Sequence, residues 1–248
     1  MDIAAAVSRN DCDTLLVAGG DGTVNEVLNG LRVADLPLAI YPLGTANVLA
    51  AEIGMPASPA AFVRALAAAT VQDAWLGEAN GGGAATRRFA LMASAGFDAR
   101  TVAAVATRGK RWLGRAAYLA AAAGLLARHR PARYRVTIDG TAHEAAGVIV
   151  AKGRYYGGRM SVAPDARITD PRLHVCLLHG DRRRDLAGYA IALATGTLHT
   201  RPDVRIIPAT EVAITGPDGD PVQLDGDIRL HLPATLRIAR VPVPLLMA

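Results

Sequence analysis

The stretch GGDGTVNEVLNGL, residues 19–31, decides how the first part of this chain folds. It directly follows Asp13–Ala18 (DTLLVA), a short apolar run whose single charge is Asp13. Such a run predicts a buried strand, and the glycines after it predict a tight turn. Val24–Leu31 then places its apolar residues at helical spacing. The opening unit is therefore predicted to be a strand, a glycine-rich loop and a helix.

A second unit of the same kind follows. Leu38–Tyr41 predicts a strand and Pro42–Asn47 (PLGTAN) a second glycine loop, with helices at 46–53 and 59–69. Alternating strands and helices favour a parallel α/β layer. Two loops at the carboxyl ends of adjacent parallel strands would converge on one crevice, where such sheets bind ligands. We expect Asn47 to cap the helix that follows it.

Both loops have the chemistry of a phosphate site. Glycines let the backbone approach an anion closely, and the helix that follows presents free N–H groups and a partial positive charge. Asp21 would repel a phosphate, so we expect it to meet Mg²⁺, a hydroxyl or a basic side chain. The alternative is a tight turn with a helix cap; Asn25 and Glu26 after the glycines favour the phosphate site.

Beyond about Val71 the pattern changes to short apolar segments separated by turns. Phe89–Ser94 is predicted as one strand, and 108–130 and 181–195 as helices. Further strands are predicted at 134–139, 148–151, 173–178, 211–215, 222–224, 228–232 and 236–238. We expect two domains: an α/β domain at 1–70 and a mainly antiparallel β domain at 71–248. A return of the last residues to the first domain is left open.

Composition excludes several classes of protein. Hydrophobic residues make up 51% of the 248 residues and charged residues 20%, which excludes a disordered chain. Two cysteines exclude a disulfide framework. No apolar run reaches the roughly 20 residues that span a bilayer. The net charge of +5 suggests a polyanionic partner or an anionic membrane surface, or reflects codon preference alone. Nothing indicates nucleic-acid binding, because no basic stripe is interleaved with aromatic residues.

A basic segment surrounds an apolar stretch that contains Trp112 and Tyr118. Its cationic residues are Arg108, Lys110, Arg111, Arg115, Arg128, Arg130, Arg133 and Arg135. A basic helix with Trp at one end is typical of a segment that lies at a membrane surface. The alternative is an Ala-rich packing helix with solvated arginine ends.

Taken together, these motifs resemble the diacylglycerol kinase catalytic family, which includes bacterial lipid kinases and the sphingosine kinases. GGDGT is shared with NAD kinases and phosphofructokinases, and PLGTANVLAAEIGMP at 42–56 favours the lipid-kinase branch. The resemblance continues through Gly96–Ala99, Tyr156–Gly158, Ala163–Ala166 and Leu224–Asp227. It implies a Rossmann-like nucleotide domain of the NAD kinase and phosphofructokinase type, followed by a β-sandwich-like domain.

The resemblance also implies roles for single residues. Asp225 is expected to be the general base, with Asp227 as the second candidate where the family has glutamate. Asp170, with the carbonyls of Arg167 and Arg172, is expected to hold Mg²⁺, although Pro171 replaces the usual glycine. ATP is expected to contact Gly19, Gly20, Asp21, Gly22, Thr23, Val24, Asn25, Gly44 and Thr45, with Glu26 supporting the loop.

Only 18 residues precede Gly19, whereas the family begins with a further strand and phosphate loop, so we expect the first domain to be incomplete. The implied activity is ATP-dependent phosphorylation of a lipid hydroxyl, in the cytoplasm or at the inner membrane face. Diacylglycerol, ceramide and sphingoid bases are all candidate acceptors, and a homodimer is left open. The alternatives are a kinase of another hydroxyl, such as NAD, or an inactive remnant that binds nucleotide or lipid.

Overall fold

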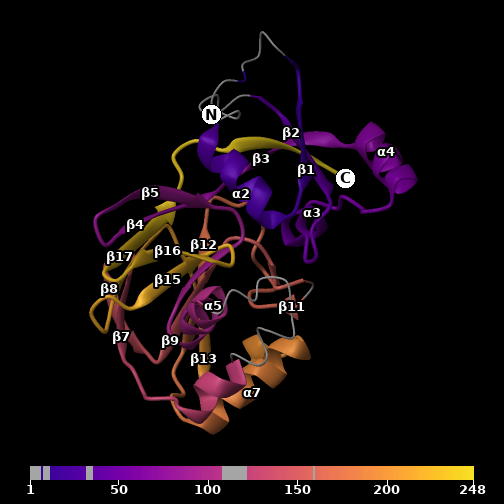
Figure 1. Cartoon of the computed structure of the whole chain (residues 1–248). Coiled ribbons are helices and arrows are strands. Elements are labelled where there is room, and N and C mark those ends of the chain that lie inside the picture. The colour runs from indigo at the N-terminus through magenta and orange to yellow at the C-terminus, as the bar shows by residue number, and fades with distance from the viewer. Residues whose placement is uncertain (1–6, 8–11, 32–35, 108–121, 159) are drawn as a thin grey trace.

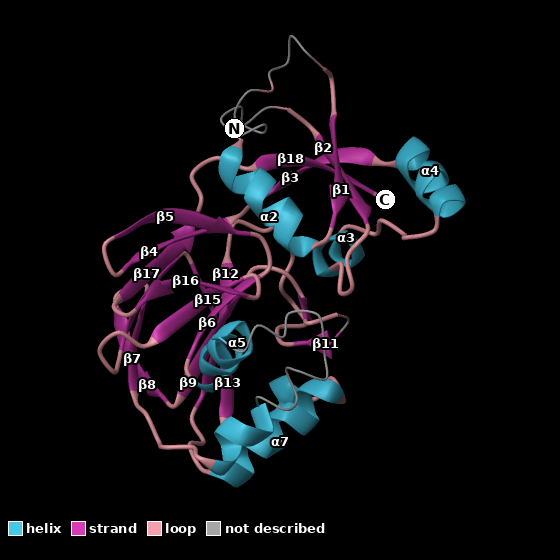
Figure 2. Cartoon of the chain, viewed as in Figure 1, coloured by secondary structure: helices cyan, strands magenta, loops and turns pink. Residues whose placement is uncertain are grey.

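The computed structural model describes residues 7, 12–31, 36–107, 122–158 and 160–248. Within these residues the chain forms a four-stranded sheet with helices, called here the first module. Two six-stranded sheets follow, called here the sandwich (Figures 1 and 2). The predicted combination of an α/β layer and an antiparallel sandwich-like domain is confirmed.

The first module is built on strands from both ends of the chain. Its sheet has the order β1 (Leu15–Gly19), β2 (Leu38–Pro42), β18 (Val243–Met247) and β3 (Thr70–Ala74). β1 and β18 run parallel to β2, and β3 runs antiparallel to β18. The expected division at residues 70 and 71 therefore cuts through β3, and the last residues do return to the first sheet.

Three helices accompany this sheet: α2 (Asp21–Gly30), α3 (Val48–Glu52) and α4 (Pro59–Ala68). In α2 the predicted apolar face is confirmed, because Val24 and Leu28 are buried in the core of the first module. Its start is earlier than predicted. An acidic residue in the first turn is favoured by the helix dipole, so the helix begins at Asp21 rather than at Val24.

The sandwich packs two antiparallel sheets face to face. One has the order β13 (Val204–Ala209), β12 (Leu173–Leu178), β9 (Gly147–Ala151), β6 (Met92–Ala95), β15 (Pro221–Leu224) and β16 (Asp227–His231). The other has the order β5 (Ala84–Phe89), β4 (Gly77–Gly81), β17 (Ala234–Ile238), β14 (Glu211–Thr215), β7 (Tyr134–Ile138) and β8 (Thr141–Ala145). Alternate residues from both sheets meet in one buried core, for example Val148 and Val150 with Val212 and Ile214.

The remaining elements are α5 (Phe97–Thr107), the hairpin of β10 (Tyr155–Tyr156) and β11 (Met160–Ser161), α7 (Arg183–Ala194) and η2 (Leu198–Thr200). Of these elements, α5 and α7 pack against the outer face of the first of the two sheets. Tyr189 of α7 packs in a separate core with Ile149 and Cys176, so β9 is buried on both faces. The first half of the predicted basic segment, residues 108–121, lies outside the described residues.

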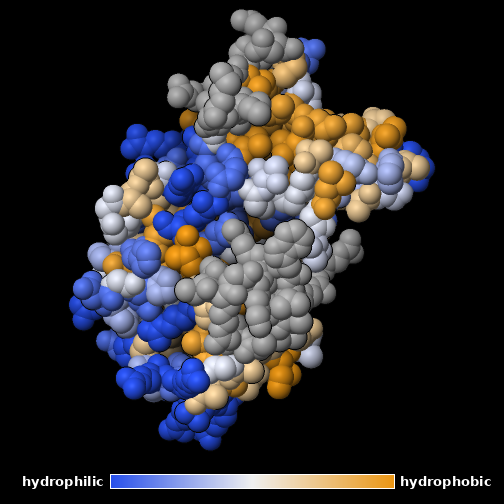
Figure 3. Space-filling view, in the orientation of Figure 1, coloured by the Kyte–Doolittle hydropathy of each residue, from blue (hydrophilic) through white to orange (hydrophobic). Residues whose placement is uncertain are grey.

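The surface of the first module is the more apolar on the face shown in Figure 3. Leu16 on β1 and Val71 on β3 are each about half exposed. Both strands are edges of the sheet within the described residues. Among all the residues that the structure describes, no helix is long and apolar enough to cross a membrane.

Candidate active site

The two glycine loops touch each other, as predicted from their places after adjacent parallel strands. β1 and β2 are in register, with Gly19 opposite Pro42, and the Leu43 amide donates to the Gly19 carbonyl. A Cβ atom built on Gly44 would lie 2.6 Å from the Cα atom of Gly20. Only glycine permits two backbones to approach this closely. The loops therefore form one continuous surface at the carboxyl ends of β1 and β2.

Asp21 holds the second loop in place. Its Oδ1 accepts a hydrogen bond from the Leu49 amide at 3.0 Å, so its partner is a backbone N–H at the start of α3. The expected capping role of Asn47 is wrong. The Asn47 side chain bonds Gly44 in both directions, with Gly44 N to Oδ1 and Nδ2 to the Gly44 carbonyl both at 2.7 Å. The side chains that close these loops thus come from the loops themselves.

The other residues predicted to contact the nucleotide differ in how exposed they are. Gly22, Thr23 and Thr45 are exposed beside the two loops and are open to a ligand. The Val24 side chain is only 2% exposed and belongs to the core, so only its backbone could face a ligand. Asn25 is buried and points toward the sandwich.

Replacing Gly44 by alanine is expected to lower the thermal unfolding midpoint and weaken ATP binding. The added methyl would overlap the Gly20 backbone and also lie 2.8 Å from Asn47 Oδ1, and overpacking of this kind costs about 1–3 kcal/mol. Gly22→Ala is the matched control for stability, because a Cβ there meets nothing within 4 Å and alanine favours a helix. An unchanged midpoint and ATP affinity in the Gly44 variant would show that the loops separate readily.

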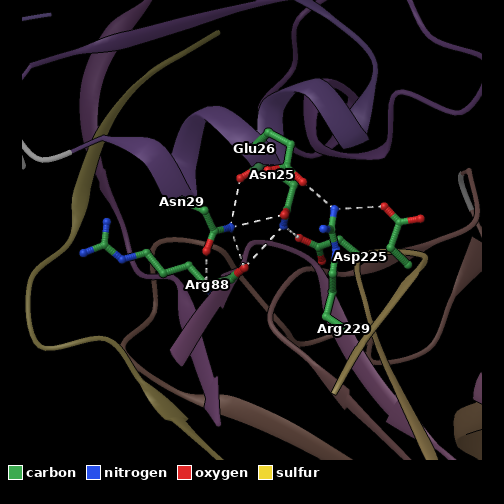
Figure 4. Close-up of polar contacts among 7 residues, drawn as sticks. Asn25, Glu26, Asn29, Arg88, Asp225 and Arg229 are labelled. Atoms are coloured by element: carbon green, nitrogen blue, oxygen red, sulfur yellow. Dashed lines mark hydrogen bonds and ion pairs between the residues drawn. The ribbon is translucent and has the colours of Figure 1, made fainter. Parts of the chain in front are cut away.

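α2 joins the glycine loops to the sandwich (Figure 4). Asn25 and Asn29 lie one helical turn apart and both face β5. The Asn29 Nδ2 donates to the Arg88 carbonyl at 3.0 Å, and its Oδ1 accepts from the Arg88 amide at 2.8 Å. Asn25 Nδ2 donates to the same carbonyl at 3.3 Å and to Asp225 Oδ2 at 2.8 Å. The helix that begins at the loops is therefore fixed to the sandwich by the side chains of Asn25 and Asn29.

Asp225 accepts hydrogen bonds at both oxygens. Besides Asn25, its donors are the amides of Ala90, Leu91 and Met92, at 2.8, 2.9 and 3.0 Å. Burial raises the pKa of the Asp225 carboxyl, and these hydrogen bonds oppose the rise. A carboxylate has about four acceptor positions, and here four donors fill them. The expected role of Asp225 as general base does not fit these contacts, because a base needs a free lone pair for the proton that it takes.

The same contacts explain why the single strand predicted at 89–94 is divided. β5 ends at Phe89 and β6 begins at Met92. Between them the chain turns its amides toward Asp225, which itself sits in the left-handed region with a φ of 48°. Asp tolerates this conformation better than most residues. The break in the strand is therefore held by hydrogen bonds to the turn Asp225–Asp227, called here the acidic turn.

Asp227 and Glu26 share an arginine. The Arg229 Nη2 lies 2.5 Å from Glu26 Oε1 and 3.2 Å from Asp227 Oδ2, which bridges α2 and β16. The expected support of the glycine loop by Glu26 is thus replaced by an ion pair with the sandwich. The side chain of Asp227 is 38% exposed, so a solvent molecule or a substrate hydroxyl can reach it. Of the two predicted acids, Asp227 has the more exposed carboxylate.

The predicted metal loop does not fit a Mg²⁺ ion. The Arg167 carbonyl already accepts from the Asp170 amide at 3.1 Å and from the Lys152 ammonium at 2.7 Å. Both of its lone pairs are therefore used. The Asp170 carboxylate lies 3.7 Å from the guanidinium of Arg172. No group of three or more His, Cys, Asp or Glu side chains in the described ranges could hold a metal ion.

Sequence reasoning did not find the polar cluster around Asp98. Its carboxylate accepts hydrogen bonds from Ser94 Oγ at 2.5 Å, from the Tyr156 hydroxyl and from Gln223 Nε2 at 3.5 Å. Gln223 also accepts from the Gly226 amide at 2.7 Å and so braces the acidic turn. Asp98 and Tyr156 stand in motifs used above for the resemblance, but nothing in the sequence indicates that these motifs meet.

Comparison with known proteins agrees with this geometry. Residues 1–79 match the model of the diacylglycerol kinase catalytic domain. Residues 91–247 match the model of the YegS C-terminal NAD kinase beta sandwich-like domain. Residues 80–90 lie between the two matches, and they include Ala90, whose amide donates to Asp225.

The similarity extends over most of the chain and of its relatives. The diacylglycerol kinase of Mycobacterium tuberculosis H37Rv is 34% identical over 98% of this chain and 78% of its own length. The "Probable lipid kinase YegS-like" of Pseudomonas aeruginosa PAO1 is 32% identical over 92% of this chain and 80% of its own length. A crystal structure of a diacylglycerol kinase from Bacillus anthracis has the same fold, with a TM-score of 0.73 and 24% identity over 95% of this chain and 78% of that one. The chain therefore belongs to the family of diacylglycerol kinases and YegS-like lipid kinases.

Proposed function

We propose that this protein transfers the γ-phosphoryl group of ATP to the hydroxyl of a lipid, with diacylglycerol as the first acceptor to test. Membership of the lipid kinase family supports the reaction class and the use of ATP. The name of the mycobacterial relative supports diacylglycerol among the candidate acceptors.

One observation carries the proposal: α2 connects the glycine loops and the acidic turn within a single helical turn. Its first residues, Asp21 and Gly22, lie at the loops, and Asn25 and Glu26 bond residues of the sandwich. Four residues of helix rise about 6 Å. A phosphate held by the free N–H groups at the start of α2 would therefore lie close to the turn that carries Asp227.

In this proposal Asp227 is the general base. Its carboxylate takes the proton of the acceptor hydroxyl while the hydroxyl oxygen bonds to the γ-phosphorus and the bond to the ADP oxygen breaks. Arg229 and Glu26 hold the carboxylate in position. Mg²⁺ is expected to enter with ATP as part of the substrate, since phosphoryl transfer needs charge neutralisation.

The acceptor is expected to be reached from the surface of an anionic membrane. The clustered basic residues of 108–135 support this by their charge. A cytoplasmic location at the inner membrane face is part of the same proposal.

The assay uses purified protein, γ-labelled ATP and Mg²⁺ with diacylglycerol in vesicles that contain anionic lipid. Parallel reactions contain ceramide, sphingosine or NAD. The expected result is label in phosphatidic acid and none in NADP. Label in NADP alone, or in no product from folded protein that binds ATP, would contradict the proposal.

A further inference from the structure

The loop Ala163–Leu173 is the place where the family resemblance implies a divalent cation, and here it is occupied by cationic groups of the chain itself. The most buried of them is Lys152, which follows β9 and is 0% exposed. It is one of two lysines in a chain that otherwise uses arginine as its basic residue. A fully buried lysine is unusual unless it is paired.

In the described residues, the carbonyl oxygens of this loop that accept a hydrogen bond from a side chain accept it from a cationic side chain. The Lys152 ammonium donates to the Arg167 carbonyl at 2.7 Å. The Arg167 guanidinium donates to the carbonyls of Pro164 and Ala166, both at 2.8 Å. These are the hard oxygen atoms that a Mg²⁺ or Ca²⁺ ion would need as ligands.

The charge partners of Lys152 are two carboxylates. Burial lowers the pKa of Lys152 to about 8, whereas the carboxylates of Asp170 and Glu52 favour its charged form. Burial lowers the pKa of His174, whose charge partners include Asp170 and Lys152. Arg172 supplies the other cation near Asp170.

We infer that the Lys152 ammonium takes the place of a divalent cation in the loop Ala163–Leu173, which consequently binds none. A divalent ion at the Arg167 carbonyl would have to displace Lys152 from it, leaving a buried ammonium without its hydrogen-bond acceptor. Such a loss is costly for a charged group. The loop thus keeps its shape without metal.

The test uses the nucleotide-free protein, so its result does not depend on the proposed kinase activity. Free Mn²⁺ is measured by electron paramagnetic resonance with wild-type protein and with Asp170→Asn. Thermal unfolding is followed in MgCl₂ and in EDTA at matched ionic strength. We expect the two proteins to bind the same amount of Mn²⁺, and the wild-type midpoint to be the same in both buffers.

Lys152→Met tests the ammonium directly. It keeps most of the side-chain volume but leaves the Arg167 carbonyl with the Asp170 amide as its remaining donor, and should lower the midpoint by roughly 3 to 12 °C. Lys110→Met, which removes the other lysine, controls for the loss of one positive charge. Mn²⁺ binding that Asp170→Asn abolishes, or a Lys152 variant as stable as the wild type, would overturn the inference. If Lys152→Met does not fold, the wild-type and Asp170→Asn measurements still decide it.

Discussion

Asp227→Asn is expected to reduce kcat/KM for lipid phosphorylation by about 100- to 10,000-fold while ATP affinity and thermal stability stay close to those of the wild type. Loss of a general base costs this much in rate. Stability should change little because the Asp227 side chain is 38% exposed and its pairing with Arg229 is partly solvated. Steady-state kinetics with ATP and diacylglycerol, together with thermal unfolding, measure both effects.

Two variants sharpen this test. Asp227→Glu keeps a carboxylate one methylene further from the backbone and should retain much of the activity. Asp218→Asn changes an aspartate in another Asp-Gly turn, outside the site, and should behave as the wild type. Near-normal turnover by Asp227→Asn would show that this carboxylate is not the base.

Asp225→Asn should instead destabilise the protein, by about 3–5 kcal/mol, and lose activity as a consequence. Asparagine also tolerates a φ of 48°, so the change tests hydrogen bonding rather than backbone strain. Whichever way the new amide is oriented, its NH₂ group faces N–H donors that now meet the carboxylate, either Leu91 and Met92 or Ala90 and Asn25. A buried donor left without an acceptor costs heavily.

Urea unfolding of Asp225→Asn measures this loss. Asp139→Asn is the matched control, since Asp139 also has a positive φ of 42° and accepts bonds from Thr210 and Glu211, but in an exposed position. Its loss should be clearly smaller. An Asp225 variant that is as stable as the wild type but inactive would restore Asp225 as a catalytic residue.

The local parts of the site could be predicted from the sequence. Glycines 19, 20 and 44 indicate two tight loops, and their contact follows from the parallel order of β1 and β2. The apolar spacing of residues 24–31 predicted the buried face of α2. In each case the information lies within a few residues of chain.

The parts that failed depend on partners distant in sequence. Asp225 and Asp227 cannot be distinguished by residue type, and their surroundings differ because the amides of 90–92 donate to Asp225. The sequence around Lys152 gives no sign of its partner, because that partner is the carbonyl of Arg167 in a later loop. Periodicity and propensity carry no information about such contacts.

The position of β18 has a consequence for how the protein is made. This strand pairs with both β2 and β3, so residues 243–247 supply an inner strand of a sheet whose other strands precede the sandwich in the chain. While the ribosome is still producing the sandwich, β2 and β3 lack this neighbour and expose unpaired backbone. Pairing between such distant segments is slow and leaves intermediates prone to aggregation. The sheet of the first module can therefore be completed only after the sandwich has been synthesised, and expression of residues 1–79 alone would give a sheet without its inner strand.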